Sequence, residues 1–362
     1  MAGVTARHIL TFAQSLDGGG VERAQLRLAA GWLAAGRRVT LMLGSKRGPL
    51  AAELPNGLRV IEHGSTAYMA MFDFPRHFSE IAPDLLFCPG NHYTSVAAWA
   101  WLELGTACPP VVAKLSNTLD RTDQSPPVAF GYRAWLRLHP RFVDHLVTMS
   151  PGMAREALDL MCFPRERISV IANPPAGPVV DLDPPSLPGD RFLLGIGRLE
   201  PQKRWQRLIE AMRTIADRRV KLVILGEGSE RAALEALIAR HGLADRVSLP
   251  GHIRDPGTAI RRAAVVVLVS EYEGVPGVLR ESLAFGTPVV TTDSSVAVRE
   301  IVTAPSLGTV VPRDDPTALV AALDQWLDPD QPQPAPIPEP GIGAAKAYLD
   351  LFDRLAVAQP NA

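Results

Sequence analysis

Short apolar runs alternate with amphipathic segments along almost the whole chain. The first series of runs is HILTFA (8–13), RVTLML (38–43), DLLFC (84–88), PVVAKL (110–115), HLVTMS (145–150) and RISVIA (167–172). The second series is RFLLGIG (191–197), VKLVILG (220–226), RVSLPG (246–251), AVVVLVS (264–270) and PVVTTD (288–293). Apolar runs of this length between segments of helical spacing are typical of strands in βα units. The pattern therefore predicts an α/β chain with two Rossmann-like, doubly wound parallel sheets.

Proline-rich segments separate these series. Proline is poorly tolerated in helix interiors and central strands, so such segments predict linkers. We expect an N-terminal domain at 1–175, a linker at 176–190, a C-terminal domain at 191–335 and a helix at 341–357 that crosses back to the first domain. The length of 362 residues suits two domains. Two facing domains of this class would place the carboxyl ends of both sheets at a central cleft, where open α/β folds bind ligands.

Charge and cysteine content argue against several protein classes. The net charge of −1 provides no concentrated basic surface, so a nucleic-acid partner is not expected. The three cysteines, Cys88, Cys108 and Cys162, lack the spacing of a disulfide framework or a zinc site. The N-terminus does not read as a secretion signal, and the longest aliphatic run, 263–269, is too short to span a bilayer. We expect a cytoplasmic protein, with a position at the inner face of the membrane left open.

The segment GIGRLEPQKRWQRLIEAM contains two cations at the junction of a predicted strand and helix. Arg198 follows the strand directly, and Lys203 lies at the expected start of a helix over 201–217. Free amides and the helix dipole favour anions at such a position, and Arg and Lys supply charge-assisted hydrogen bonds. The pair is suited to hold a diphosphate without a metal ion. The alternative is that both side chains are solvated surface cations.

The segment SEYEGVPGVLRESLAFGTPVV places two carboxylates along one loop and helix. Glu273 follows an apolar strand, and Glu281 lies eight positions later in the predicted helix. A carboxylate accepts hydrogen bonds from hydroxyl groups, and amides near Gly277 and Val278 stay free for phosphate oxygens. One carboxylate could meet a sugar and the other a ribose. The alternative is a solvated loop residue and a helix-start carboxylate that the dipole stabilises.

Together, these motifs resemble the retaining GT-B glycosyltransferases of family four. The matching segments are GRLEPQKRWQRLIEA, LVILGEGSERAALEALIARHGLADRVSLPGHI and EYEGVPGVLRESLAFGTPVVTTD, in the family's order. The resemblance covers nearly the whole chain and is strongest at 191–311. It implies the GT-B fold, in which two Rossmann-like domains enclose a cleft. It also implies transfer of a sugar from a nucleotide-diphosphate sugar with retention of configuration and without a metal ion or other cofactor.

The resemblance also implies roles for single residues. Arg198 and Lys203 match the pair that binds the donor diphosphate, Glu273 the carboxylate that contacts the donor sugar, and Glu281 the one that holds the ribose. Further donor contacts are implied for Gly226, Val247, Leu249, Gly251, Gly277 and Val278.

In the first domain the match is looser. SLDGGGVER resembles the family's glycine loop, with Gly19 and Gly20 on its glycine pair near the donor. A histidine that usually follows a later strand has no counterpart. Asn117 or His92 is expected to take that place near the sugar, and each has the alternative of only satisfying loop backbone.

These observations predict a hexosyltransferase in bacterial polysaccharide or glycolipid assembly, with a UDP-sugar favoured as donor and GDP-mannose next. The acceptor is expected to be a carbohydrate or a lipid-linked hydroxyl compound. Alternatives of the same fold are a catalytically inactive sugar-nucleotide-binding protein and a nucleotide-sugar epimerase. A dinucleotide-dependent oxidoreductase is disfavoured because Gly18–Gly20 are contiguous rather than spaced as GxGxxG.

The segment GYRAWLRLHPRFVDHL (131–146) interleaves arginines with large apolar residues. This composition is typical of segments that rest on an anionic lipid surface. The alternative is a helix buried on one side with its arginines in water. Peripheral membrane contact is therefore one of two open interpretations.

Overall fold

The computed structural model describes residues 5–17, 19–121, 124–175, 187–189, 191–253 and 255–358. The chain divides into two compact units. Unit 1 comprises Met1–Pro174 and Pro340–Ala362, and unit 2 comprises Pro175–Glu339. Most of the predicted linker, 176–186, lies outside the described residues, as does Gly18.

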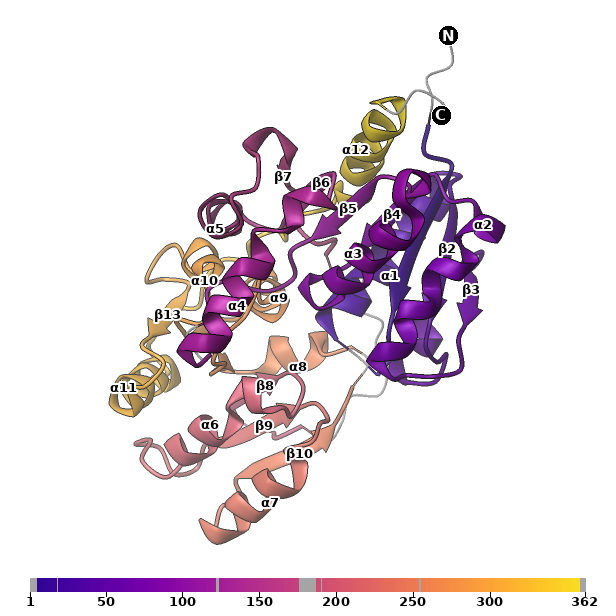
Figure 1. Ribbon diagram of the computed structural model, residues 1–362. Coiled ribbons are helices and arrows are strands. Elements are labelled where there is room, and N and C mark those ends of the chain that lie inside the picture. Colours follow the sequence, from indigo (N-terminus) through magenta and orange to yellow (C-terminus); the bar gives the residue numbers. More distant parts are fainter. Residues whose placement is uncertain are drawn as a thin grey trace. The chain divides into compact units, whose positions relative to one another are not determined.

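Unit 1 is built on a seven-stranded sheet with the order β3-β2-β1-β4-β5-β6-β7 (Figure 1). Its strands are β1 (His8–Ala13), β2 (Arg38–Leu43), β3 (Arg59–Glu62), β4 (Leu85–Cys88), β5 (Val111–Lys114), β6 (His145–Thr148) and β7 (Ile168–Val170). Neighbouring strands pair in parallel, as in β1 with β2 and β4. The order reverses between β1 and β4, which makes their carboxyl ends the switch point of this sheet.

Helices and 3-10 turns connect these strands. The α-helices are α1 (Gly20–Ala34), α2 (Phe78–Ile81), α3 (Thr94–Leu104), α4 (Pro126–Leu136), α5 (Pro151–Met161) and α12 (Ala344–Ala358). The 3-10 turns are η1 (Pro49–Glu53), η2 (Tyr68–His77), η3 (Asn91–Tyr93), η4 (Gly105–Ala107), η5 (His139–Arg141) and η6 (Arg165–Arg167). Helix α5 begins at a serine cap, because Ser150 Oγ accepts from the Met153 amide at 3.3 Å.

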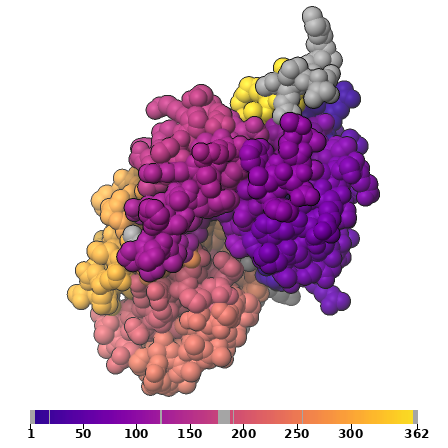
Figure 2. Space-filling view, viewed as in Figure 1, coloured from indigo at the N-terminus to yellow at the C-terminus, as the bar shows by residue number. Residues whose placement is uncertain are grey.

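The last helix, α12, packs in the core of unit 1. Trp32 of α1 is fully buried and meets Tyr348 and Phe352 of α12 edge-on, with ring centroids 5.9 and 5.3 Å apart. At the helix surface, Arg37 Nη2 lies 2.8 Å from Asp353 Oδ2. Figure 2 shows the yellow atoms of this helix beside the indigo N-terminal part of the same unit. Unit 1 therefore includes chain from both ends of the sequence.

Unit 2 has a six-stranded parallel sheet with the order β10-β9-β8-β11-β12-β13. Its strands are β8 (Phe192–Ile196), β9 (Lys221–Leu225), β10 (Val247–Gly251), β11 (Val265–Leu268), β12 (Val289–Thr292) and β13 (Gly308–Val311). Its helices are α6 (Trp205–Ala211), α7 (Arg231–Arg240), α8 (Gly257–Arg262), α9 (Gly277–Ala284), α10 (Val296–Ile301) and α11 (Pro316–Leu327), with a 3-10 turn η7 (Pro201–Lys203). The order reverses between β8 and β11, so ligand binding is expected beyond those strand ends.

These two sheets confirm the predicted α/β fold class, although several local details differ. The helix expected over 201–217 is divided, because Arg204 has a left-handed backbone (φ 51°) between η7 and α6. The short edge strands β3 and β13 were not predicted. In β3 the two end residues are exposed and the middle two half-buried, and in β13 the middle two are half-buried. Periodicity thus found the buried strands and the edge strands β7 and β10, and it overlooked the edge strands β3 and β13.

Candidate functional site

The two predicted diphosphate ligands lie beyond the carboxyl end of β8. Arg198 is exposed, and its carbonyl accepts from the buried Trp205 indole at 3.0 Å. Lys203 ends the 3-10 turn that follows. Gly226, at the end of β9, approaches so closely that a Cβ there would collide with the Gly197 carbonyl. The cation loop is therefore held against the neighbouring strand end by backbone packing.

Lys203 and Glu273 form a direct ion pair. Lys203 Nζ lies 2.5 Å from Glu273 Oε1, and only 15% and 11% of the two side chains are exposed. Ser270 Oγ donates to the same carboxylate oxygen at 2.6 Å, and the Glu273 amide donates to the Ser294 carbonyl at 2.9 Å. Partial burial strengthens such a pair relative to a surface pair, because water screens it less. The fold thus brings Lys203, predicted to bind the diphosphate, into contact with Glu273, predicted to bind the sugar, at the switch point.

The carboxylate beside this pair has a different environment. Glu271 accepts from Arg204 Nε at 3.2 Å and Arg207 Nη2 at 2.9 Å, and Arg313 Nη1 lies 3.9 Å from it. Its amide donates to the Gln202 carbonyl at 2.8 Å. These contacts fix the loop after β11 to η7 and α6. Sequence reasoning did not single out Glu271, and its contacts are those of a structural residue.

The second predicted carboxylate lies in α9. Glu281 is half-buried there, and a Cβ built on Gly277 would stand 4.0 Å from Glu281 Oε1. Pro276 precedes the helix without a side-chain cap, and Val278 packs against the core of unit 2. Glu281 therefore lies beside the first turn of the helix, where amides are available to a ligand.

Three of the residues with implied donor contacts, Val247, Leu249 and Gly251, lie along β10. The Gly226 amide donates to the Gly251 carbonyl at 2.9 Å, and Arg231 Nη1 donates to the Leu249 carbonyl at 3.1 Å. Gly251 has φ 98°, a conformation that favours glycine. Val247, at the opposite end of the strand, is only 5% exposed and belongs to the core. The structure therefore brings Gly251 to the strand ends that carry Arg198 and places Val247 in the interior.

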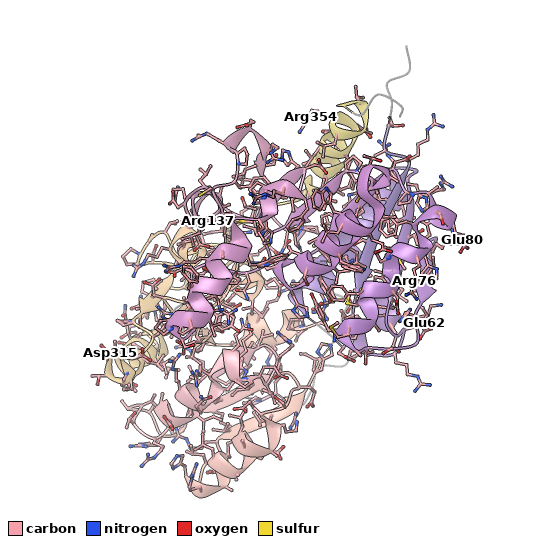
Figure 3. The ribbon with its side chains drawn as sticks, viewed as in Figure 1. Glu62, Arg76, Glu80, Arg137, Asp315 and Arg354 are labelled. Atoms are coloured by element: carbon pink, nitrogen blue, oxygen red, sulfur yellow. The ribbon has the colours of Figure 1, made fainter. Side chains whose placement is uncertain are left out.

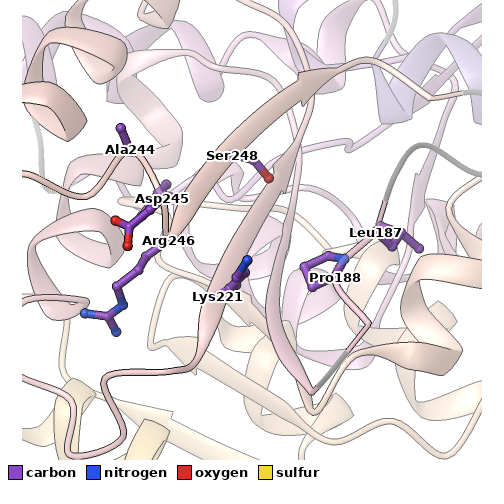
Figure 4. Close-up of a pocket in the computed structure, with 8 residues that line it drawn as sticks. Leu187, Pro188, Lys221, Ala244, Asp245, Arg246 and Ser248 are labelled. Carbon is purple, nitrogen blue, oxygen red and sulfur yellow. The ribbon is translucent and has the colours of Figure 1, made fainter.

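A pocket of about 340 Å³ lies at the opposite ends of the strands of this sheet. It is lined by Leu187, Pro188, Lys221, Ala244, Asp245, Arg246, Val247 and Ser248 (Figure 4). Lys221 and Val247 begin β9 and β10, so the pocket lies at the amino ends of these strands. Arg198, Lys203 and Glu273, which are predicted to bind the donor, lie beyond the carboxyl ends of the strands, at the opposite end of the sheet.

In unit 1 the glycine loop ends at the start of α1. Gly19 is the N-terminal cap in an extended conformation (φ −161°), and its carbonyl accepts from the Arg23 amide at 3.1 Å. A Cβ on Gly19 would collide with the Glu22 carboxylate, whereas one on Gly20 would meet nothing within 4 Å. The two glycines therefore differ: the absence of a Cβ at Gly19 leaves space for the Glu22 carboxylate, whereas Gly20 has no such neighbour.

The two candidates for the sugar-side residue of unit 1 lie at neighbouring strand ends. His92 follows β4 and is exposed, and partial burial of its ring lowers its pKa while the Glu22 charge opposes that shift. Asn117 follows β5, and its Oδ1 accepts from the Thr118 amide at 3.0 Å. Asn91 connects the two ends, since its Oδ1 accepts from the Ser116 amide at 2.7 Å. Asn91 was not recognised from sequence, because nothing local reveals a contact across 25 positions.

Among the residues that the structure describes, no group of three or more His, Cys, Asp and Glu side chains is arranged to hold a metal ion. Within those same residues, none of the helices has the length and apolar character needed to cross a bilayer.

Comparisons with known proteins agree with this architecture. Residues 183–336 match the family model described as "Glycosyl transferases group 1", and residues 19–174 match "Glycosyl transferase 4-like domain". The N-acetylgalactosamine-N,N'-diacetylbacillosaminyl-diphospho-undecaprenol 4-alpha-N-acetylgalactosaminyltransferase of Campylobacter jejuni is 32% identical over 47% of this chain and 45% of its own length. The lipopolysaccharide core biosynthesis glycosyltransferase LpsD of Rhizobium meliloti is 30% identical over a region that covers 59% of this chain and 64% of its own length. The aligned regions span less than two thirds of these relatives.

Solved structures extend the similarity over the whole fold. Anabaena HepE in complex with UDP and glucose has a TM-score of 0.71 and 20% identity, with 97% of each chain covered. The sucrose-phosphate synthase of Thermosynechococcus elongatus has a TM-score of 0.70 and 19% identity, and 97% of each chain is again covered. The chain therefore carries a glycosyl transferase 4-like domain followed by a glycosyl transferases group 1 domain, and it has the GT-B glycosyltransferase fold.

Proposed function

We propose that this protein transfers a sugar from a nucleotide-diphosphate sugar to a hydroxyl acceptor, with retention of anomeric configuration and without a metal ion. The observation that carries the proposal is the ion pair between Lys203 and Glu273 beyond the switch point of unit 2. A cation suited to phosphate and a carboxylate suited to sugar hydroxyls lie within one hydrogen bond of each other. A nucleotide sugar presents diphosphate and sugar directly adjacent, so one ligand would engage both groups.

The chemistry follows from charge. As the sugar–phosphate bond breaks, positive charge develops on the sugar ring and negative charge on the departing diphosphate. Lys203 and Arg198 would stabilise the diphosphate, and removal of one such fixed donor typically costs about 10²- to 10³-fold in rate. The departing phosphate oxygen would accept the proton of the acceptor hydroxyl on the same face, so retention needs no additional protein base.

The relatives inform the choice of substrates. We favour a UDP-sugar as donor, because the fold matches a protein solved with UDP and glucose, and place GDP-mannose next. The curated relatives act in lipopolysaccharide core biosynthesis or on a diphospho-undecaprenol acceptor. We therefore propose a carbohydrate or lipid-linked acceptor in bacterial polysaccharide or glycolipid assembly.

A lipid-linked acceptor would bring the protein to a membrane surface, and α4 is the element suited to that contact. Its exposed apolar side chains are Val128 (56%) and Phe130 (78%), and Leu138 (42%) follows it. Arg133 is exposed on the same helix, and Arg137, the residue directly after the helix, is also exposed. In contrast, most of the predicted segment 131–146 beyond Leu138 is buried in η5 and β6. We propose docking of α4 on anionic lipid at the inner face of the cytoplasmic membrane.

Thermal-shift measurements with UDP, GDP, ADP and their sugars test the donor assignment. A ligand that binds only the native state raises the unfolding free energy by RT ln(1 + [L]/Kd), which is about 2.7 kcal/mol at 100 times Kd. We expect UDP and one UDP-sugar to raise the melting temperature most, without added metal and in the presence of EDTA. No shift with any nucleotide would overturn the assignment, and a shift that disappears with EDTA would overturn its metal-free form.

A further inference from the structure

A cluster of polar and aromatic side chains lies at the switch point of unit 1. Of its members, only His92 was expected near the sugar, and the others have no assigned role. It consists of Glu22, Tyr68, His92 and Tyr93, which we call the Glu22 cluster. Glu22 lies in the first turn of α1, beyond the end of β1, and His92 and Tyr93 belong to η3, beyond the end of β4. The cluster therefore occupies the edge where an open α/β sheet binds ligands.

The Glu22 carboxylate is held in place by a buried tyrosine. Tyr93 is only 3% exposed, and its hydroxyl donates to Glu22 Oε1 at 3.2 Å while accepting from the Gln14 amide at 3.2 Å. Phe12 meets the Tyr93 ring edge-on, with centroids 5.8 Å apart. The carboxylate is thereby fixed to the loop between β1 and α1, and it remains partly exposed.

An aromatic surface lies beside this carboxylate. The rings of His92 and Tyr68 have centroids 4.6 Å apart, and His92 contacts the Tyr93 ring at 5.2 Å. The Tyr68 hydroxyl donates to the His92 carbonyl at 2.5 Å. Partial burial lowers the pKa of His92, so its exposed ring is mostly neutral at pH 7. An apolar ring face beside one placed polar group is a common design of small-molecule sites.

A buried cation provides the counter-charge below the loop. Lys114, at the end of β5, is 1% exposed and donates to Asn173 Oδ1 at 3.2 Å. Burial lowers the Lys114 pKa to about 8, and the negative charge of Glu22 acts in the opposite direction. The Glu22 carboxylate accepts hydrogen bonds from hydroxyl groups, and its negative charge repels phosphate.

We propose that the Glu22 carboxylate binds hydroxyl groups of the sugar acceptor, whose ring rests against His92. This inference rests on the proposed sugar transfer. A carboxylate is unsuited to a diphosphate, and the expected cationic ligands of that group all lie in unit 2. Tyr93 acts as a positioning residue, since it orients Glu22 without contacting the acceptor. The glycine loop, expected near the donor, then serves acceptor binding through Gly19, which leaves space for the carboxylate.

Binding of octyl glucoside, octyl galactoside and octyl N-acetylglucosaminide to the full chain tests the proposal by ligand-detected NMR titration. Loss of a hydrogen bond to a charged group predicts a Kd about 10- to 100-fold higher for Glu22→Gln. Tyr93→Phe should raise Kd by a smaller factor, about three- to tenfold, because the carboxylate stays but is released. Gly19→Ala should also raise Kd, because its Cβ displaces the carboxylate.

Glu80→Gln is the matched control, since Glu80 is an exposed carboxylate on α2 (Figure 3) and should leave Kd unchanged. The UDP-dependent thermal shift, measured on the same samples, should be equal in the wild type, Glu22→Gln, Tyr93→Phe and Glu80→Gln. Absence of a UDP-dependent shift in the wild type would refute the donor assignment. The glycoside titration would still test acceptor binding independently. The proposal is overturned if Glu22→Gln lowers only the melting temperature and not glycoside affinity, or if the wild type binds none of the glycosides.

Discussion

At the level of single residues, the pair of Lys203 and Glu273 couples two predicted roles. In the structure, Lys203 Nζ lies 2.5 Å from Glu273 Oε1, and the Ser270 hydroxyl donates a hydrogen bond to the same oxygen. In the proposed reaction, the diphosphate would compete with Glu273 for Lys203. Engagement of the sugar hydroxyls by Glu273 would release the lysine at the same time. Under this proposal, donor binding would be favoured when sugar and diphosphate arrive as one molecule.

This competition predicts opposite effects of Glu273→Gln on binding and turnover. The amide is isosteric and uncharged, so it should release Lys203 and tighten the binding of free UDP by up to about tenfold. Turnover of the nucleotide sugar should fall by about 10² or more, because the charge that faces the developing positive sugar ring is lost. Isothermal titration of UDP and a donor-release assay measure the two quantities.

Glu271→Gln is the comparison for that experiment. Glu271 lies two positions away and contacts Arg204 and Arg207, so its substitution should lower stability without tightening UDP binding. If Glu273→Gln weakens UDP as much as it slows turnover, the ion pair does not restrain Lys203 and this account of the residue is wrong.

The sequence predicted the placement of single residues best where position relative to a strand end was sufficient, and the roles of these residues stay predictions. Arg198, Lys203 and Glu273 follow strands whose apolar runs are unambiguous, and the parallel sheet brings those ends together. The bond between Tyr93 and Glu22 joins positions 71 apart in sequence. It depends on register between β1 and β4, which no local pattern contains.

At the level of elements, helix α4 differs from the amphipathic segment expected at 131–146. The helix ends at Leu136, and His139, at 2% exposed, ties its end by Nδ1 contacts to the Trp135 and Leu136 carbonyls at 3.0 and 3.1 Å. The apolar side chains beyond Leu138, such as Phe142, are buried in the core. Alternation of charge and apolar residues could not show which apolar side chains the sheet would cover.

Cosedimentation with vesicles of phosphatidylglycerol and phosphatidylcholine tests the docking of α4. Each arginine near an anionic surface contributes about 1 kcal/mol, so Arg133→Glu with Arg137→Glu should lower partitioning at least tenfold. Phe130→Ser should lower it independently of salt, since the side chain is 78% exposed and apolar. Arg137 and the control residue Arg76 are labelled in Figure 3.

Arg76→Glu reverses an exposed charge of the same unit on η2 and should leave partitioning unchanged. Equal partitioning of the wild type and the double variant would remove α4 from any membrane contact.

At the level of the whole molecule, the alternation of apolar and amphipathic segments was sufficient to predict two parallel α/β sheets. It succeeded because central strands of such sheets are buried on both faces and read as continuous apolar runs. A last helix that crosses back to the first domain was expected from its position after a proline-rich segment. Its contact with Trp32 is visible only in the structure.

The central claim, sugar transfer from a nucleotide sugar held by Lys203, is tested most directly by donor turnover. Release of nucleoside diphosphate from UDP- and GDP-sugars, with an alkyl glycoside as acceptor, is measured for the wild type, Lys203→Ala and Lys221→Ala. Lys221 is exposed at the opposite edge of the same sheet and serves as the matched control. We predict turnover in the wild type and the control and a loss of about 10² or more in Lys203→Ala. Near-normal turnover by Lys203→Ala, or no release by the wild type from any donor, would contradict the account.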